Sequence, residues 1–480
     1  MAGRRDLMDL ITACQDSHLF KPWFRDPATW STWFTFIRAL FALPMDEQEL
    51  EIYTRCTGRV APLTEPASES WLACGRRSGK SFILSLIAVY LSTFRDWRPY
   101  LAPGEHATVM VVASDRKQAR TILRYIKAFL EECALLKPLI QRMAGTNENY
   151  SIELDGRVTI EVHSCSFRRV RGYTVVAALL DEIAFWRSDE GVANPDREVI
   201  AAIRPAMATV PGSMMLCASS PYSRRGALWD AHRRYFAKDG PILIWQASTL
   251  TMNPTIPARV VEAEFERDPT VAASEWAAEF RTDVESYVTR EAIESCIEPG
   301  VRERPPIQGV RYRGFVDPSG GRNDSMTLAI AHREEDCAVL DCVREVKPPF
   351  DPSSVVREFA DTLKYYNVRE VRGDKYGGEW PAAEFRRANI WYRSAERPKS
   401  DLYRELLPAV NARRVELLDN SRLVAQLVGL ERRVGRGGRD SVDHGPGAHD
   451  DVANACAGAI DMVLGKARSA TVSSSPLLGI

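Results

Sequence analysis

The chain has 480 residues, of which 45% are hydrophobic and 26% are charged, with 63 Lys and Arg against 64 Asp and Glu. This length exceeds what one hydrophobic core usually serves, so two or three soluble globular domains are expected. The net charge of −1 excludes a globally basic nucleic-acid binder, because any such affinity must then come from local patches.

The ten cysteines are scattered, with no C-x-x-C pair and no His/Cys set at zinc spacing. This pattern indicates a reducing compartment, and neither a disulfide framework nor a structural zinc. The N-terminus lacks the apolar core of a signal peptide, and no run of about 18 apolar residues occurs. We therefore expect a cytoplasmic protein that is not secreted and has no membrane partner.

Residues 1–60 are rich in aromatic side chains, and five apolar residues follow the spacing of one helix face. They predict a helical extension that packs on the following domain. A contact between Gln48 and a nucleotide base is the alternative, which the spacing does not support. The residues of the face are Trp30, Trp33, Phe34, Ile37 and Phe41.

The stretch Cys74-Gly75-Arg76-Arg77-Ser78-Gly79-Lys80-Ser81 follows a run compatible with a strand and precedes an apolar segment, 82–91, long enough for a buried helix. In such a strand–turn–helix setting, backbone N–H groups and a helix N-terminus cradle phosphates. The first glycine of the usual motif is replaced by Cys74, with Gly75 one place later. The alternative is that Gly-Lys-Ser occurs by chance at the start of a helix. The partner motifs expected further along the chain are also present, which argues against this alternative.

In a phosphate loop of this kind, Gly79 lets the backbone approach the anion, Lys80 reaches the β/γ-phosphates and the Ser81 hydroxyl holds Mg²⁺. We therefore expect a nucleoside triphosphate with Mg²⁺ at this loop. The candidate binding residues are Gly75, Arg76, Arg77, Ser78, Gly79, Lys80 and Ser81.

From residue 107 the pattern becomes α/β. Residues 107–113 predict a buried strand, and residues 151–162 predict a hairpin around Asp155-Gly156. The three arginines of residues 167–173 indicate either a solvated loop or a contact with DNA or phosphate.

Two further strands end in polar residues. Residues 175–180 are apolar and lead into Asp181 and Glu182, which predicts a central parallel strand with carboxylates at its C-terminal edge. In P-loop enzymes such an Asp supports Mg²⁺, and the adjacent Glu polarises the attacking water. Residues 213–221 predict another buried strand, which ends in Ser219-Ser220-Pro221 and either senses the γ-phosphate or simply turns there.

The second half of the chain presents separated acids in a renewed α/β pattern. Asp317 and Asp374 each end a predicted strand, and Asp450 and Asp451 begin a helix of small residues. Two-metal phosphodiester cleavage needs carboxylates that converge on ions about 3.5–4 Å apart, and such oxygen ligands suit Mg²⁺ or Mn²⁺. Any one of these acids, taken alone, is more often a cap or turn residue. The neighbouring His449 is either a further ligand or a helix cap, and a lone His is more often the latter.

Residues 432–439 form a basic, glycine-containing loop, for which phosphate contact and a plain surface loop are both open. Residues 466–480 are rich in Ser and small side chains and predict a flexible tail.

The deviant phosphate loop, the run Leu-Leu-Asp-Glu-Ile-Ala-Phe-Trp at 179–186 and the Ala-Ser-Ser-Pro at 218–221 together resemble the large terminase subunit of tailed bacteriophages. Residues 246–249 and 275–281 are similar to the tail of that family's ATPase domain. The family is a DNA-packaging motor that joins an N-terminal ATPase to a C-terminal RNase H-like nuclease.

The resemblance implies roles for particular residues. Arg76 corresponds to an arginine finger acting in cis, Glu182 to the catalytic glutamate and Ser219-Ser220-Pro221 to the motif that couples hydrolysis to DNA movement. Asp317, Asp374 and the pair Asp450/Asp451 correspond to the metal-binding acids of the nuclease. The family's adenine-binding motif has no clear counterpart here.

The resemblance also implies ATP with Mg²⁺ as cofactors, with Mn²⁺ as an alternative in the nuclease site. The implied partners are double-stranded DNA, a small terminase subunit and the portal protein of the procapsid. The protein would work in the host cytoplasm as a homo-oligomeric ring on the portal, where the C-terminal tail would dock, and would be either a ring or a monomer in isolation.

We therefore expect an α/β protein with five parts. These are a helical extension (1–60), a P-loop ATPase domain with a mostly parallel sheet (61–290), a linker (291–310), an RNase H-like nuclease domain with a mixed sheet and flanking helices (311–465), and a tail (466–480). The expected function is ATP-driven DNA translocation with metal-dependent endonucleolytic cutting. The alternatives are a helicase-type ATPase whose second domain binds nucleic acid without cutting it, and a non-enzymatic DNA-binding assembly protein.

Overall fold

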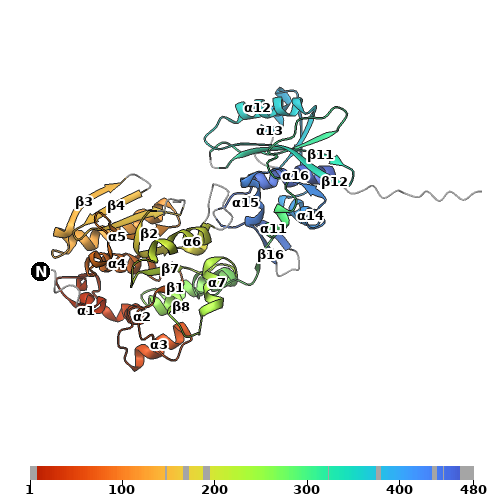
Figure 1. Cartoon of the computed structure of the whole chain (residues 1–480). Helices are drawn as coiled ribbons and strands as arrows, with labels where there is room; N and C mark the ends of the chain where they lie inside the picture. The colour runs from red at the N-terminus through yellow and green to blue at the C-terminus, as the bar shows by residue number, and fades with distance from the viewer. Residues whose placement is uncertain are drawn as a thin grey trace, which may run out of the picture. The chain divides into compact units, whose positions relative to one another are not determined.

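The computed structural model describes residues 8–145, 149–165, 172–186, 195–322, 324–374, 380–434, 440–446 and 448–464. The chain divides into two compact units, the first ending at Thr282 and the second beginning at Asp283 (Figure 1). The arginines predicted in the loop at 168–171, most of the basic loop at 435–439 and the predicted tail lie outside the described residues.

The first unit is built on an eight-stranded sheet of order β3-β4-β5-β2-β6-β7-β1-β8. In the run β5-β2-β6-β7-β1-β8, each strand pairs in parallel with its neighbours. Strand β3 pairs antiparallel with β4, and β4 pairs antiparallel with β5. The predictions of a mostly parallel sheet and of a hairpin at 151–162 are therefore confirmed. The strands are β1 (Glu69–Cys74), β2 (Ala107–Ala113), β3 (Ile140–Gly145), β4 (Asn149–Leu154), β5 (Val158–Ser164), β6 (Thr174–Asp181), β7 (Met214–Ser219) and β8 (Ile242–Ala247).

The strand order brings the three predicted motifs to one edge of the sheet. Strand β7 lies between β1, which leads into the phosphate loop, and β6, which ends in Asp181. The register pairs Ala73 with Ser219, and Asp181 with Ala218. Because parallel strands end at the same edge, the loop, the acids and the serines become neighbours there.

Helices cover both faces of this sheet. In β2, Val109 and Val111 face the core that contains α2, α4 and α5, whereas Met110 and Val112 face the core that contains α6 and α7. This alternation is the period of two of a strand buried on both sides. The helices are α1 (Leu10–Gln15), α2 (Ser31–Leu40), α3 (Glu47–Thr57), α4 (Lys80–Thr93), α5 (Arg116–Glu132), α6 (Pro195–Met207), α7 (Gly226–Tyr235), α8 (Thr249–Met252), α9 (Ala258–Arg267) and α10 (Pro269–Glu275).

The aromatic extension belongs to the first core. The helix predicted from its spacing is α2, whose Trp33, Phe36 and Ile37 are fully buried in the cluster that also holds α4. The ring of Phe36 meets that of Trp245 from β8 edge-on, with centroids 5.4 Å apart. The extension is therefore packed against the sheet edge that carries β1 and β8.

The second unit contains a six-stranded sheet of order β14-β13-β10-β11-β12-β15 and a three-stranded sheet of order β17-β16-β9. Strands β10, β11 and β12 pair antiparallel, and β13 and β14 continue in parallel on the other side of β10. This order is that of an RNase H-like fold, so the predicted mixed sheet is confirmed. The strands are β9 (Val284–Ser286), β10 (Tyr312–Asp317), β11 (Met326–Glu334), β12 (Cys337–Val346), β13 (Glu370–Gly373), β14 (Trp391–Ser394), β15 (Val415–Glu416), β16 (Leu430–Val434) and β17 (Asp440–His444).

The larger sheet is again covered on both faces. Phe315 of β10 packs with α14, α15 and α16, whereas the next residue, Val316, packs with α12 and α13. The described helices of this unit are α11 (Arg290–Glu294), α12 (Pro352–Tyr365), α13 (Trp380–Arg387), α14 (Lys399–Asn411), α15 (Ser421–Gly429) and α16 (Asp451–Leu464).

Residues 291–310, predicted as a linker, belong instead to the second unit, because the chain changes unit at 282/283. Arg304 holds the segment to β12: its backbone N–H donates to Asp341 O at 2.8 Å, and its Nη1 donates to Leu340 O at 2.8 Å. Further contacts join Val301 O to the backbone N–H of Asp419 at 2.8 Å and Cys296 O to that of Leu417 at 2.7 Å. The proline- and charge-rich composition of the segment therefore reflects its exposure and not a lack of contacts.

A search for spans among the described residues finds no helix with the length and apolar character needed to cross a bilayer.

The small residues of α16 allow the helix to lie close to the sheet, and this contact generates a prediction. A Cβ added at Gly458 would lie 2.4–2.6 Å from ring atoms of Phe315. We expect Gly458→Ala to destabilise the second unit by about 1–3 kcal/mol, since a buried ring or the helix must shift. Calorimetric unfolding of the full chain measures the change.

The matched control is Gly429→Ala at the end of α15, where an added Cβ meets nothing within 4 Å. That variant is expected to be neutral or slightly more stable. Equal unfolding temperatures for Gly458→Ala and the wild-type protein would contradict the close packing of α16 on β10.

Candidate functional site

The phosphate loop joins β1 to α4 and is held from two sides. The indole Nε1 of Trp33 donates a hydrogen bond of 2.7 Å to Ser78 O, and Asn253 Nδ2 donates one of 2.8 Å to Arg77 O. Gly79 has a φ of 98° at the helix N-cap, a conformation that favours glycine. The contact of Trp33 with the loop was not predicted, because the spacing of the aromatic face shows only that it is buried.

The displaced glycine of the motif has a packing reason. Cys74 is the last residue of β1 and is fully buried, whereas a Cβ at Gly75 would lie 2.2 Å from Thr249 Oγ1 and 2.7 Å from Trp276 O. The Thr249 hydroxyl donates to Arg76 O at 2.7 Å. The chain therefore needs glycine one place later than usual, where α8 approaches the loop.

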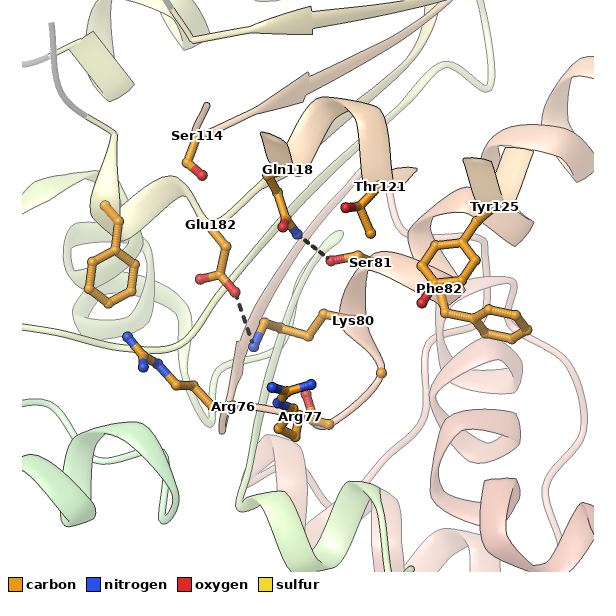
Figure 2. Close-up of a pocket in the computed structure, with 13 residues that line it drawn as sticks. Arg76, Arg77, Lys80, Ser81, Phe82, Ser114, Gln118, Thr121, Tyr125 and Glu182 are labelled. Atoms are coloured by element: carbon orange, nitrogen blue, oxygen red, sulfur yellow. Dashed lines mark hydrogen bonds and ion pairs between the residues drawn. The ribbon is translucent and has the colours of Figure 1, made fainter. Parts of the chain in front are cut away.

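Lys80 lies buried beneath the loop. Its Nζ donates to Cys74 O at 3.0 Å, to Gly75 O at 3.1 Å and to Ser220 Oγ at 3.2 Å. The same Nζ lies 3.5 Å from Glu182 Oε1 (Figure 2). The lysine predicted to reach the phosphates therefore stands between the phosphate loop and the predicted catalytic glutamate.

Ser81 and Asp181 meet as the motifs predict. Ser81 Oγ donates to Asp181 Oδ2 at 2.8 Å, and Gln118 Nε2 donates to both of these oxygens, at 2.8 and 2.7 Å. Asp181 is fully buried, and its Oδ1 accepts no hydrogen bond from any described residue. Burial and the adjacent Glu182 raise the pKa of Asp181 to about 6. A hydroxyl and a buried carboxylate with a free oxygen are a fitting ligand set for Mg²⁺.

Gln118 is a site residue that the sequence analysis missed. It lies in the first turn of α5, after the Asp115 N-cap, and β2 places that turn beside the end of β6. Its only sequence signal is its place just after a strand end, which it shares with many polar residues.

Glu182 adopts a left-handed backbone conformation, with φ 53° and ψ 42°. Its Oε2 accepts hydrogen bonds from Ser219 Oγ at 3.1 Å and from Ser220 N at 3.3 Å. A non-glycine residue in this region stores roughly 1–3 kcal/mol of strain, which is common at functional sites. The serines of the predicted coupling motif thus contact both Glu182 and Lys80.

These residues open onto a cavity of about 530 Å³ (Figure 2). Arg76 is half-exposed at its rim and pairs with Glu275, with Nη2 and Oε1 2.9 Å apart. Phe82 and Tyr125 contribute aromatic surface, whereas Gln48 is exposed on α3 and does not line the cavity. The lining residues are Arg76, Arg77, Ser78, Gly79, Lys80, Ser81, Phe82, Ser114, Gln118, Thr121, Tyr125, Glu182 and Phe185.

The second cluster lies at the C-terminal ends of β10 and β13. The parallel register pairs Val316 with Gly373, so Asp317 and Asp374 leave the sheet side by side. Asn454 of α16 donates from one nitrogen, Nδ2, to Asp317 Oδ2 at 3.0 Å and to Asp374 Oδ2 at 2.7 Å. The structure therefore brings together the two strand acids and the helix that begins at Asp451, as predicted. Asn454 was not predicted.

The two acids at the start of α16 have different neighbours. Asp450 Oδ2 is 3.0 Å from Lys399 Nζ and accepts a hydrogen bond of 2.8 Å from the Tyr403 hydroxyl. Asp451 Oδ2 accepts a hydrogen bond of 3.3 Å from Ser325 N.

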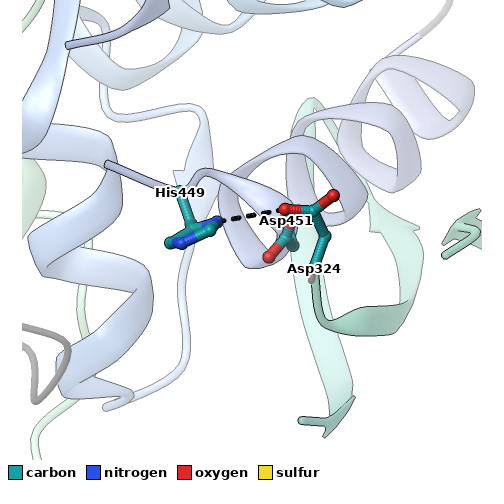
Figure 3. A group of neighbouring side chains, drawn as sticks. All are labelled: Asp324, His449 and Asp451. Carbon is teal, nitrogen blue, oxygen red and sulfur yellow. Dashed lines mark ion pairs between the residues drawn. The ribbon is translucent and has the colours of Figure 1, made fainter. Parts of the chain in front are cut away.

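His449 and Asp324 lie close to Asp451 (Figure 3). His449 Nδ1 is 3.3 Å from Asp324 Oδ1, and one potential ligand atom of each of the three residues lies within 4.8 Å of the others. The sequence left open whether His449 is a ligand or a cap, and its side chain faces the acids.

The carboxylates of the second unit raise one another's proton affinity. Burial raises the pKa of Asp317 well above its usual range, and the charges of Asp374, Asp451 and Asp450 add to that rise. Burial likewise raises the pKa of Asp374, and that of Asp451 to about 6. Asp317 and Asp374 meet on Asn454, and the charges of Asp450 and Asp451 are close enough to act on Asp317. Such hard oxygen donors fit divalent cations such as Mg²⁺ or Mn²⁺.

No family model matches the sequence, and no curated protein matches it. Among solved structures, the large terminase of bacteriophage HK97 is 16% identical, with 82% of this chain and 91% of that chain covered and a TM-score of 0.36. The large terminase of the thermophilic bacteriophage D6E in complex with ADP is 11% identical, with 83% and 94% covered and a TM-score of 0.36. The large terminase nuclease from thermophilic phage G20c with bound magnesium is 15% identical, with 36% and 95% covered and a TM-score of 0.32.

All three are large terminases of bacteriophages. They are the kind of protein that the motifs of this chain resemble. A likeness at such identities concerns the fold, and the function is therefore argued from the residues of the chain itself.

The raised pKa of Asp181 generates a prediction for the protein without nucleotide and divalent cation. Because the folded pKa of about 6 exceeds the usual value of 3.8, the folded state binds more protons between these values, and stability falls as pH rises through that window. We expect Asp181→Asn to raise the unfolding temperature of the first unit above pH 6, by about 2–4 °C for each kcal/mol gained, and to have little effect near pH 4.

Melting curves of both proteins across this pH range measure the effect. The asparagine keeps an oxygen to accept the bonds from Ser81 and Gln118, so packing is preserved. A difference in melting temperature that does not change with pH would contradict the prediction.

Proposed function

We propose that this chain is a large terminase subunit, with ATP hydrolysis in the first unit driving double-stranded DNA into a procapsid and metal-dependent cutting of concatemeric DNA in the second. The observation that carries the proposal is that one chain holds two separate clusters for phosphate chemistry. One gathers Lys80, Ser81, Asp181 and Glu182, and the other gathers Asp317 of β10 and Asp374 of β13 on Asn454 of α16, the helix that begins at Asp451.

In the first unit, the phosphate loop and Lys80 would bind the triphosphate of ATP. Lys80 already points its ammonium group at loop carbonyls and Glu182, so an incoming phosphate replaces neutral acceptors with a charged one. Ser81 and Asp181 would hold Mg²⁺, which neutralises charge on the phosphates. Phe82 and Tyr125 offer the cavity's aromatic surface for the base.

Glu182 would orient the attacking water. Its carboxylate lies within reach of the cavity and is fixed by Ser219 and Ser220 at the end of β7. A change in what Glu182 contacts during hydrolysis therefore alters the hydrogen bonds of the segment 219–221. This direct contact supports the coupling role proposed for Ser219, Ser220 and Pro221.

In the second unit, Asp317 and Asp374, with Asp450 or Asp451, would hold the divalent ions, Mg²⁺ or Mn²⁺. When bound, such ions activate water and neutralise the leaving oxygen of the cut phosphodiester. The surroundings favour Asp451 as the helix ligand, because Asp450 is already engaged by Lys399 and Tyr403.

The proposal includes the partners of a packaging motor. These are double-stranded DNA, a small terminase subunit and the portal of the procapsid, on which the chain would assemble as a ring in the host cytoplasm. The proposed domains follow the two units, with the helical extension packed into the ATPase.

The second candidate is a helicase-type translocase whose second unit binds nucleic acid without cutting it. It shares the ATP site. The convergence of two half-buried acids on one amide nitrogen favours cutting, because a plain binding surface for phosphates has no use for clustered carboxylates.

Separate loss of the two activities tests the proposal. We expect Asp317→Ala to abolish plasmid cleavage with Mn²⁺ while sparing ATP turnover. Glu182→Gln should lower ATP turnover by about 10²–10³-fold or more, as expected for a residue acting on the reacting water, and should spare cleavage.

The measurements are phosphate release and plasmid nicking for wild type and both variants in parallel. ATP turnover without any Mn²⁺-dependent cleavage by the wild type would support the helicase-type candidate, and cleavage that persists in Asp317→Ala would exclude Asp317 from the cutting site. Lys80→Ala provides the control for the ATP site, and unchanged turnover in that variant would exclude the first unit as a nucleotide site.

Arg76 generates a second prediction. Its guanidinium is tied to Glu275 at the rim of the cavity, from where it would swing towards the phosphates as an arginine finger. We expect Arg76→Lys to lower turnover almost as much as Arg76→Ala does, by about 10³-fold, because an ammonium does not reproduce the planar fork. ATP hydrolysis rates with nucleotide affinities measure this, and full activity of Arg76→Lys would contradict the role.

A further inference from the structure

Asn454 lies in the first turn of α16 and is 1% exposed. Its single nitrogen, Nδ2, donates to one carboxylate oxygen of Asp317 and to one of Asp374. These are the acids that the proposed nuclease uses to hold cations. The amide group therefore occupies the space between the two acids of the sheet.

The other end of the same amide has no partner. Asn454 Oδ1 is buried and accepts no hydrogen bond from any described residue. A buried carbonyl oxygen left in this way costs about 1–3 kcal/mol, and such a group in a folded protein calls for an explanation, of which an ion is one. The residues that follow and precede Asn454 on the helix are apolar, so they offer no side-chain donor.

A cation held between Asp317 Oδ2 and Asp374 Oδ2 would compete with this NH₂ group for the same space. Both carboxylate oxygens lie within 3.0 Å of Nδ2, whereas Mg²⁺ binds oxygens at about 2.0–2.1 Å. A cation shared by Asp317 and Asp374 therefore takes the place of the NH₂ group. Because the oxygen and nitrogen of an asparagine exchange by rotation about the last side-chain bond, the same rotation brings Oδ1 to the vacated position.

We propose that Asn454 is a metal ligand of the second unit. Without a cation its NH₂ group bridges Asp317 and Asp374, and on cation binding the amide turns so that Oδ1 coordinates the ion. This inference rests on the proposed nuclease function and adds a neutral oxygen to its carboxylates. Asn454 lies three residues after Asp451, the first residue of α16, so the helix presents both residues on neighbouring positions of one face.

The orientation of the Asn454 amide also explains how Asp317 and Asp374 lie side by side without metal. The NH₂ group gives each strand acid a charge-assisted hydrogen bond, which limits their mutual repulsion. Without metal, Asn454 thus stabilises the two neighbouring carboxylates, and with metal the cation stabilises them.

The test is Mn²⁺ binding to the full-length chain, measured by calorimetry for wild type, Asn454→Ala and Asn454→Asp. We expect Asn454→Ala to weaken Mn²⁺ binding by about 10–100-fold, the range for residues in and around metal sites. Asn454→Asp is expected to bind Mn²⁺ at least as tightly as wild type, because it keeps an oxygen in the same place and no longer has an NH₂ group to displace.

The matched control is Gln426 of α15, a buried amide whose Oε1 accepts a hydrogen bond of 2.9 Å from Ala453 N. Gln426→Ala removes a buried amide beside the same helix, and Gln426→Glu adds the same charge as Asn454→Asp. Both are expected to leave Mn²⁺ affinity near that of wild type. Melting temperatures without metal report any loss of folding in each variant.

Three outcomes would overturn the ligand role. Equal losses in Asn454→Ala and Asn454→Asp would make Asn454 a hydrogen-bond donor only, and no loss in Asn454→Ala would leave it a packing residue. Tighter Mn²⁺ binding by Gln426→Glu, to the extent seen in Asn454→Asp, would assign the effect to charge.

The companion variant Asp317→Ala separates this inference from the function on which it rests. Mn²⁺ binding lost in Asp317→Ala but kept in Asn454→Ala overturns the ligand role alone. Mn²⁺ binding that survives Asp317→Ala overturns the proposed nuclease site, and the ligand role with it.

Discussion

Carboxylates buried at the ends of sheet strands are the constraint on which both units depend. An ionised carboxylate out of water is strongly disfavoured unless donors or cations surround it. Asp181 at the end of β6 and Asp317 at the end of β10 both have raised pKa values because of burial. Each unit must therefore supply hydrogen-bond donors or cations at the edge of its sheet where these carboxylates lie.

In both units, a side-chain amide from a helix donates hydrogen bonds to these carboxylates. Gln118 of α5 donates to Asp181 and to Ser81, and Asn454 of α16 donates to Asp317 and Asp374. In both places a carboxylate or amide oxygen remains unpartnered, Asp181 Oδ1 and Asn454 Oδ1. An unpartnered buried oxygen beside a carboxylate is a suitable ligand for a cation.

The phosphate loop depends on packing as much as on its own residues. Trp33 of α2 binds the Ser78 carbonyl, and Thr249 of α8 leaves room only for glycine at position 75. The helical extension and the segment after β8 therefore set the shape of a loop to which neither is close in sequence. A loop held at both ends loses less conformational entropy when it binds an anion.

The sequence by itself determined the kind of chemistry and the type of each element around it. Local signals were sufficient for the phosphate loop and for the apolar strand that ends in Asp181 and Glu182. They also placed the acids at 317, 374 and 450–451 at the ends of elements, but the role expected for those acids came from the family resemblance. Each of these is a polar residue placed against a periodic apolar run, and both the run and its end can be recognised within a few residues.

Only the tertiary structure decided which of these residues meet and what completes each site. The position of β7 between β1 and β6 brings Ser219 to Glu182, and the parallel pairing of β10 with β13 brings Asp374 to Asp317. Gln118, Asn454 and the contact of Trp33 with the phosphate loop escaped prediction, because the local sequence around an amide or a buried aromatic does not show its distant partner. Their roles arise from contacts between residues far apart in the chain, and such contacts exist only once the sheets have formed.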